Sequence, residues 1–359
     1  MKRSYFIRAS VILASLFLTQ HLIAQNSFFD NYVYHSWNAF GSLNGTTITD
    51  IVQTNDGYLN IGTYEGLARF DGVAFTTHKH TSTNDLSFVS VRAILEDSHG
   101  NLWVGSNDEG LQKISSASKK TYSMKNGLPN NSIRCLAEDK KGNVWVGTAA
   151  GVVYITPQGH MITPQFEAGT ISKGIIATHL YCDTAGRMWL LTANERGLFM
   201  FNDGIFRTIP ELESYGIYFA TAICQDLKGV FWVGLGENGL LRIQNANIEK
   251  IQSNTILDQA ATTSIYTTRD GTVWFGSEHG LVVLSEGNFY EYNGNNALSS
   301  AKINKIICDR ENNIWLATER NGIGKLTNGK FKMTKLGVTV NSIAEDQKGT
   351  VWVGTDSGV

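Results

Sequence analysis

Polar side chains of several types gather in short segments that lie between the end of a repeated motif, which is Gly-Thr or Gly-Ser in several copies, and the next glycine. Their amide, carboxylate, imidazole and guanidinium groups suit a polar ligand bound through hydrogen bonds and charge. The members of this set are Tyr64, Glu65, Asn107, Asp108, Glu109, Asn194, Glu195, Arg196, Glu237, Asn238, Glu278, His279, Glu319, Arg320 and Asn321. The segments differ from one another while the residues around them repeat, which is typical of a binding surface on a rigid support. Taken singly, each residue also fits a solvated turn.

Catalytic and metal-binding motifs have little support. Gly234, Gly236 and Gly239 spell GxGxxG, but they lie between two expected strands and open no helix, as a dinucleotide site requires. The histidines show no HExxH spacing, and no GxSxG occurs. We therefore expect no catalytic residue, no cofactor and no metal, and no enzyme activity in this chain. A lyase or hydrolase site assembled from separate repeats is the alternative.

The four cysteines are scattered and show no CxxC spacing for a metal or redox site. Each precedes a motif residue described below by seven to ten positions, which places them on equivalent strands of different repeats; they are Cys135, Cys182, Cys224 and Cys308. We expect buried free thiols, with a disulfide as the alternative.

A short string recurs eight times and organises the chain. Examples are HGNLWVGS and KGNVWVGT, and the central residues of the copies, 37 to 44 positions apart, are Asn60, Trp103, Trp145, Trp189, Trp232, Trp274, Trp315 and Trp352. In most copies the central residue is the middle one of three consecutive apolar residues. A half-exposed strand would instead alternate apolar with polar residues. Both faces of this strand are therefore expected to be buried.

A turn precedes each central residue. A glycine stands three positions before it in seven copies, and Asn312 replaces the glycine once. An aspartate usually stands three positions earlier still, as in Asp97, Asp139, Asp183, Asp226, Asp309 and Asp346. We expect each carboxylate to accept hydrogen bonds from the turn backbone, because a residue repeated in every unit is more often scaffold than catalyst.

A repeat of about 42 residues accommodates four strands and their turns, which is the size of a propeller blade. The sequence therefore predicts an all-β propeller of four-stranded blades, seven in number, and an open solenoid is the alternative. The predicted propeller covers 25–339, and 340–359 is the start of a further blade, truncated at Val359. The rival is an eight-bladed ring in which Asn31 to Trp37 supplies the missing strand of the last blade. Asn60 departs from the Trp pattern, so blade one is expected to pack less tightly there or to hydrogen-bond the amide.

The N-terminus resembles a secretory signal peptide over 1–24. Lys2, Arg3 and Arg8 precede an apolar run from Ala9 to Leu18, which is too short to span a bilayer. An uncleaved anchor is the alternative. We expect an exported protein on the periplasmic or extracytoplasmic face of the inner membrane, attached to it only through segments outside this chain.

Composition narrows the range of partners. The net charge near -2 and pI near 6.5 provide no basic surface for nucleic acid. A polar small molecule or an oligosaccharide is the expected ligand, and a homodimer is an open possibility.

The repeats, together with the string NGLPNNSI at Asn126 to Ile133, resemble the two-component regulator propeller repeat. The resemblance implies the extracytoplasmic sensing region of a membrane-bound bacterial signalling protein, with a histidine kinase or diguanylate cyclase as output domain. No such output domain occurs in this chain. A secreted propeller that acts alone, as a carbohydrate-binding protein or as a lyase or hydrolase, is the alternative function.

Overall fold

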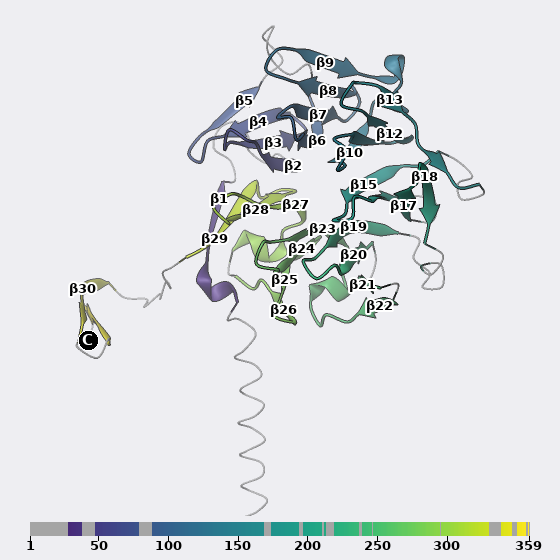
Figure 1. Ribbon diagram of the computed structural model, residues 1–359. Helices are drawn as coiled ribbons and strands as arrows, with labels where there is room; N and C mark the ends of the chain where they lie inside the picture. Colours follow the sequence, from purple (N-terminus) through teal and green to yellow (C-terminus); the bar gives the residue numbers. More distant parts are fainter. Residues whose placement is uncertain are drawn as a thin grey trace, which may run out of the picture.

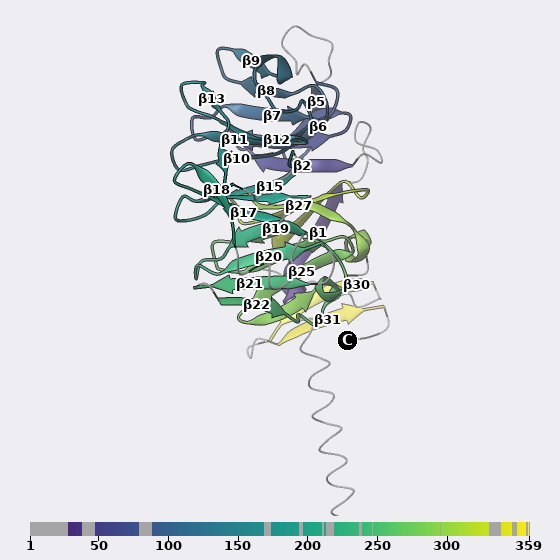
Figure 2. The same ribbon diagram turned by 90° about the vertical axis from the view of Figure 1, so that its right-hand side faces the viewer.

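Seven four-stranded antiparallel sheets stand as blades around a central axis in the computed structural model of the chain (Figure 1). The structure describes residues 28–37, 47–78, 88–168, 174–193, 197–209, 212, 219–236, 239–245, 247–294, 296–329, 339–346, 350–356 and 358. A view turned by 90° shows the strands running roughly along the ring axis (Figure 2). The predicted all-β propeller with seven blades is confirmed.

The four strands of each blade follow one another outward from the axis. The inner strands are β2 (Ile48–Gln53), β6 (Val91–Glu96), β10 (Ile133–Glu138), β15 (Ala177–Cys182), β19 (Ala220–Gln225), β23 (Thr262–Thr267) and β27 (Ile303–Cys308). The second strands are β3 (Leu59–Thr63), β7 (Leu102–Ser106), β11 (Val144–Thr148), β16 (Met188–Thr192), β20 (Phe231–Leu235), β24 (Val273–Ser277) and β28 (Ile314–Thr318). The third strands are β4 (Gly66–Phe70), β8 (Leu111–Ile114), β12 (Gly151–Ile155), β17 (Leu198–Asn202), β21 (Leu240–Gln244), β25 (Gly280–Ser285) and β29 (Ile323–Asn328). The outer strands are β5 (Phe75–His78), β9 (Lys119–Tyr122), β13 (Met161–Ile162), β18 (Ile205–Thr208), β22 (Asn247–Ile251), β26 (Asn288–Glu291) and β1 (Tyr32–Trp37).

The remaining elements are a short strand and several 3₁₀ turns. Strand β14 (Gln165–Phe166) adds to the fourth blade by pairing parallel to β18. The described residues also form short 3₁₀ turns: η2 (Phe29–Asn31) precedes β1, and η3 (Met124–Asn126), η4 (Ile256–Asp258) and η5 (Ala297–Ser300) lie between blades.

The ring closes by joining the N-terminal strand to the seventh blade. Strand β1 pairs antiparallel with β29, from Tyr32 opposite Asn328 to Trp37 opposite Ile323. The segment therefore completes blade seven, and the eight-bladed rival is wrong. The eighth motif forms a separate two-stranded sheet of β30 (Val340–Glu345) and β31 (Val351–Thr355), in which Trp352 is 52% exposed.

The motif tryptophans of the ring lie between adjacent blades, as the buried strands predicted. The ring of Trp189 lies 4.8 Å from that of Phe231 in the next blade, and Trp315 of blade seven packs in one cluster with Ile48 and Phe70 of blade one. Each of the six tryptophans at these positions is at most 5% exposed. Because burying such large side chains dominates the apolar free energy of folding, these contacts hold the ring together.

Asn60 occupies the corresponding position of blade one and is 5% exposed. Its Nδ2 donates to Oγ1 of Thr54 at 2.9 Å, so the second of the two expectations for this residue, a hydrogen-bonded amide, is confirmed. The buried amide is thereby paired. Left without a partner, it would lower the free energy of unfolding by about 1–3 kcal/mol.

The motif glycine after the tryptophan allows the sheets to converge near the axis. A Cβ at Gly276 would lie 2.8 Å from Cγ2 of Ile303 in the next blade, and one at Gly62 would lie 3.0 Å from Cγ1 of Val91. A side chain at either position would push the neighbouring inner strand outward.

The turn aspartates act as predicted. Oδ1 of Asp97 accepts from the backbone N of His99 at 3.1 Å and of Asn101 at 2.8 Å. The same two-bond pattern recurs in the other blades that carry the aspartate, for example at Asp183.

All four cysteines are free thiols on equivalent inner strands, as predicted, but only Cys135 and Cys224 are buried, whereas Cys182 and Cys308 are partly exposed. The expected signal peptide at 1–24 lies outside the described residues. Among the residues that are described, no helix has the length and hydropathy needed to cross a membrane.

Candidate functional site

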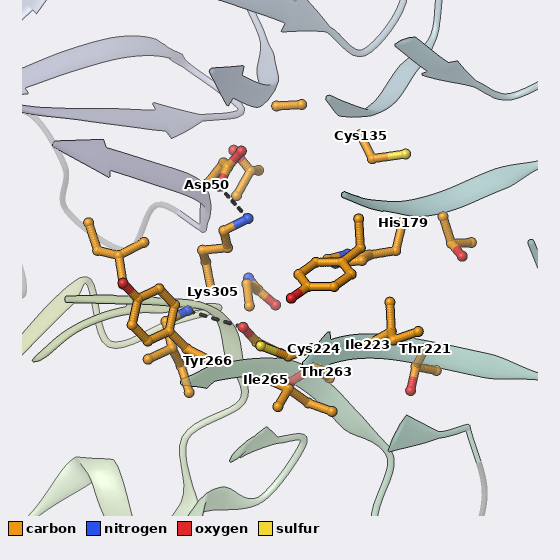
Figure 3. Close-up of a pocket in the computed structure, with 18 of the residues that line it drawn as sticks. Asp50, Cys135, His179, Thr221, Ile223, Cys224, Thr263, Ile265, Tyr266 and Lys305 are labelled. Atoms are coloured by element: carbon orange, nitrogen blue, oxygen red, sulfur yellow. Dashed lines mark hydrogen bonds and ion pairs between the residues drawn. The ribbon is translucent and has the colours of Figure 1, made fainter. Parts of the chain in front are cut away.

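A cavity of about 660 Å³ runs along the axis of the ring, where the seven inner strands face one another (Figure 3). Its volume falls within the roughly 300–1,000 Å³ of ligand pockets. Every inner strand contributes to its lining, from β2 through β27. All seven blades therefore contribute to the wall of this cavity.

One structural position recurs around this cavity. Each inner strand has a β-bulge directly after its first residue, because the pairing register with the second strand shifts there. The seven bulged residues all line the cavity and are Thr49, Arg92, Arg134, Thr178, Thr221, Thr263 and Asn304. Ile48, next to the first of them, pairs with Thr63, so the bulges lie on the side of the ring that carries the loops between second and third strands.

Four of the bulged residues join one blade to the next. Oγ1 of Thr49 donates to the carbonyl of Val91 at 2.9 Å, and Nδ2 of Asn304 donates to the carbonyl of Ile48 at 2.8 Å, across the closure of the ring. Thr221 and Thr263 donate in the same way to the carbonyls of Thr262 and Ile303. This ring of side chains was missed in the sequence analysis. The sequence does mark it, because each bulged residue stands eleven positions before the motif residue of its repeat.

Asp50 is the central carboxylate of the cavity. It accepts from the backbone N of Ile51 and of Ile94, both at 2.9 Å, and lies 3.6 Å from Nζ of Lys305 (Figure 3). Asp50 thus connects blade one with blades two and seven, and its charge is balanced within the cavity.

His179 and Cys135 are neutral lining groups. Burial, with a smaller contribution from Lys305, lowers the pKa of His179 to about 3. Burial raises the pKa of Cys135 to about 12. Both side chains are therefore uncharged near neutral pH, and Cys135 is not a thiolate nucleophile.

The residues predicted from the sequence form the rim of this cavity only in part. Tyr64 and Glu319 line it. Glu319 and Glu278 both pair with Nζ of Lys302, at 3.4 and 3.9 Å, and Lys302 also lines the cavity. Oδ1 of Asn107 lies 3.4 Å from a guanidinium nitrogen of Arg92. These four predicted residues contact the cavity or the cations that line it.

The other predicted residues are not brought to the cavity. Glu109 accepts from the backbone N of Val89 at 3.0 Å, while Glu65 and His279 contribute backbone bonds to their own turns. Asp108, Arg320 and Asn321 do not line it. Five predicted residues lie outside the described part of the chain: Asn194, Glu195, Arg196, Glu237 and Asn238. Their role in binding stays a prediction.

Among the described residues, no group of three His, Cys, Asp or Glu side chains is placed to hold a metal ion. Of the GxGxxG glycines, Gly234 lies in β20, and Gly236 and Gly239 lie between β20 and β21 of the same blade.

Known sequences show the same repeat. The family described as "Two component regulator propeller" matches residues 85–108, 127–150 and 335–357. Three segments of the chain thus match this repeat. No curated protein matches the sequence.

The propeller of this chain is similar to solved structures that include extracellular domains of signalling proteins. One is from the protein described as the putative hybrid two component system BT3049 of B. thetaiotaomicron, with a TM-score of 0.71, 21% identity, and coverage of 90% of this chain and 47% of that chain. A second is from BT4673 of the same organism, with a TM-score of 0.66, 17% identity, and coverage of 89% and 44%. The chain thus spans about half the length of these domains.

A third similar structure is an enzyme. It is a catalytically inactive variant of virginiamycin B lyase from Staphylococcus aureus with quinupristin, with a TM-score of 0.66, 18% identity, and coverage of 82% of this chain and 99% of that chain. At such identities the likeness concerns the fold alone.

Proposed function

We propose that this two-component regulator propeller senses a polar small molecule or an oligosaccharide outside the cytoplasm, as part of a membrane-bound bacterial signalling protein. The observation that carries the proposal is the axial cavity, lined by hydroxyl, amide and charged groups from every blade. The repeats and the likeness to extracellular domains of hybrid two component systems support it. The output domain lies outside this chain.

The arrangement of the cavity suits sensing because its walls are the inner strands themselves. Blade-to-blade hydrogen bonds such as Thr49 to Val91 and Asn304 to Ile48 surround it. A ligand that forms hydrogen bonds with several bulged residues changes the packing of neighbouring blades. A signal requires the ligand to contact two states of the protein differently.

The proposal is tested by screening the purified chain against neutral and charged saccharides by thermal shift, with isothermal titration calorimetry for each hit. A ligand that stabilises the chain should lose affinity in the variant Tyr64→Ala, at the rim of the cavity. Tyr58→Ala is the matched control, since Tyr58 lies in a loop between the first and second strands, on the opposite side of the ring. Absence of a stabilising ligand, or equal losses in both variants, would contradict the proposal.

A second experiment addresses signalling. In the bacterium that encodes the chain, the ligand should change transcription of a set of genes only when the gene for this protein is intact. An unchanged response after its deletion would reject the sensor role even if binding holds.

A propeller that acts alone as a lyase is the second candidate, because the S. aureus lyase is matched over nearly its whole length. The lining of the cavity favours binding over catalysis. A general base works best with a pKa near the operating pH, whereas His179, with a pKa of about 3, is a weak base at pH 7. Turnover of quinupristin or of any bound saccharide by the purified chain would favour the lyase.

A further inference from the structure

We propose that Arg92, Arg134 and Thr178 form an oxyanion-binding site in the axial cavity, which takes the carboxylate or sulfate group of a small ligand. The three residues occupy the bulge position of blades two, three and four, next to one another around the ring. The inference deepens the sensing function proposed above and rests on it for its physiological role, but the binding itself is testable separately.

The first observation is an interruption in the ring of bulged residues. In blades one, five, six and seven, the bulged side chain donates to a backbone carbonyl of the next blade. In blades two, three and four no such bond forms among the described residues. Three adjacent positions of the cavity wall therefore present their polar groups to the cavity.

The second observation is that two of these groups lack any partner. Nε of Arg134 and Oγ1 of Thr178 are buried and make no hydrogen bond within the described part of the chain. An unpaired buried polar group destabilises the fold, and more so when it is charged. Unsatisfied groups of this kind call for an explanation, and a ligand that accepts hydrogen bonds from both would supply one.

The third observation is the distribution of charge. Four cationic side chains line the cavity against two carboxylates: Arg92, Arg134, Lys302 and Lys305, with Asp50 and Glu319. Both lysines pair with carboxylates, Lys305 with Asp50 and Lys302 with Glu319 and Glu278. Among the described residues, neither arginine forms an ion pair. The excess positive charge of the cavity is therefore concentrated at the two arginines.

The arginines also influence each other. Burial, followed by repulsion from Arg92, lowers the pKa of the Arg134 guanidinium. The partner that Arg92 has is a neutral acceptor, Oδ1 of Asn107, which lies 3.4 Å from a guanidinium nitrogen. Two guanidinium groups at the bulge positions of adjacent blades, both lining the cavity, suit a planar or tetrahedral oxyanion, because each group can donate two parallel hydrogen bonds to it.

The test compares D-glucuronate with its neutral analogue D-glucose, alongside inorganic sulfate and phosphate, by calorimetry on the purified chain. We expect the acids to bind and glucose to bind at least tenfold more weakly. Arg92→Gln and Arg134→Gln should each weaken glucuronate binding about tenfold or more, since hydrogen bonds to charged groups are worth about 1.5–3 kcal/mol. Thr178→Val, which keeps the shape of the side chain, should weaken it by a smaller factor.

Arg242→Gln serves as the matched control, because Arg242 pairs with Glu249 on the outer half of blade five and does not line the cavity. It should leave binding unchanged. A further readout separates a binding role from a structural one: without ligand, Arg134→Met should raise the melting temperature, because it removes an uncompensated charge. A structural arginine would lower it.

Each outcome bears on the inference. Equal binding of glucuronate and glucose, or unchanged glucuronate affinity in both arginine variants, would overturn it while leaving a sensor of neutral ligands intact. Binding of sulfate and phosphate without glucuronate would also overturn the carboxylate part and identify an inorganic anion as the ligand. Glucuronate binding that changes no transcription in the bacterium would uphold the site and reject the sensing function.

Discussion

Nε1 of Trp103 donates a hydrogen bond of 2.7 Å to Oδ2 of Asp97, six residues earlier in the chain. The same bond occurs at Trp145, Trp189, Trp232 and Trp315, at 2.7 to 3.1 Å. One carboxylate thus organises the turn through Oδ1 and fixes the orientation of the indole through Oδ2. This explains why the Asp and the Trp recur at a constant spacing.

Asp97→Ala should destabilise the ring. Burial alone would raise the pKa of Asp97, but the hydrogen bonds from Trp103 and Asn101 outweigh it and lower the pKa, so the carboxylate is ionised and paired. We expect a loss of about 2–3 kcal/mol in the free energy of unfolding, measured by urea denaturation. Asp346→Ala is the control, because the same bond to Trp352 lies in the exposed β30–β31 hairpin. Equal effects of the two substitutions would contradict this account.

Blade six lacks the bond, and its repair should stabilise the protein. Nε1 of Trp274 is buried without a partner among the described residues, since Thr268 stands where the other blades have the aspartate and its hydroxyl donates to Asp270 instead. The double variant Thr268→Asp, Asp270→Lys reproduces the arrangement at Asp139 and Lys141 of blade three. We expect a gain of about 1 kcal/mol in the free energy of unfolding. A loss of stability would show that the Thr–Asp pair serves blade six better.

Gly276→Ala should separate blades six and seven. The added Cβ would lie 2.8 Å from Cγ2 of Ile303, and overpacking of this kind costs about 1–3 kcal/mol. Gly174→Ala is the control, because its Cβ would meet nothing closer than 3.8 Å. The melting temperatures of the two variants measure the difference, and similar values would argue against close packing at the axis.

His179 should make stability depend on pH in the weakly acidic range. Its pKa is lowered from 6.5 to about 3 in the folded chain, so the unfolded chain takes up a proton below pH 6.5 while the folded chain does not. Stability is therefore full above pH 6.5 and falls toward pH 3, by up to about 1.4 kcal/mol per pH unit. The lowered pKa values of Asp97 and Asp183 act in the same direction, but only below the ordinary aspartate value of 3.8.

Urea midpoints at pH 7.5 and pH 5 measure this dependence. His179→Gln should flatten the difference between the two midpoints, whereas His99→Gln, on an exposed turn, should preserve it. A pH dependence that survives in the His179 variant would assign it to another group.

Local pattern was sufficient for the blade. The constant spacing of tryptophan, glycine and aspartate predicted four-stranded units with a strand buried on both faces. The positions of the cysteines relative to the motif residues predicted free thiols on equivalent strands. Each of these features depends on residues within one repeat or its immediate neighbour. A hydrogen bond from the Asn60 amide was one of two expectations, and it too depends on residues within one repeat. The bond from indole to aspartate was not foreseen, although both of its residues had been singled out.

Ring closure and the site were decided by the tertiary structure. The angle at which neighbouring sheets pack determines that seven blades complete the circle, and no single repeat encodes it, so only the fold shows that Tyr32–Trp37 finishes blade seven. The cavity likewise joins Asp50 to Lys305, 255 positions along the chain, and is lined by both Arg92 and Arg134. The variable loops were apparent from the sequence, whereas the bulged residues at the axis became a site only because closure brings seven separate strands to face one another.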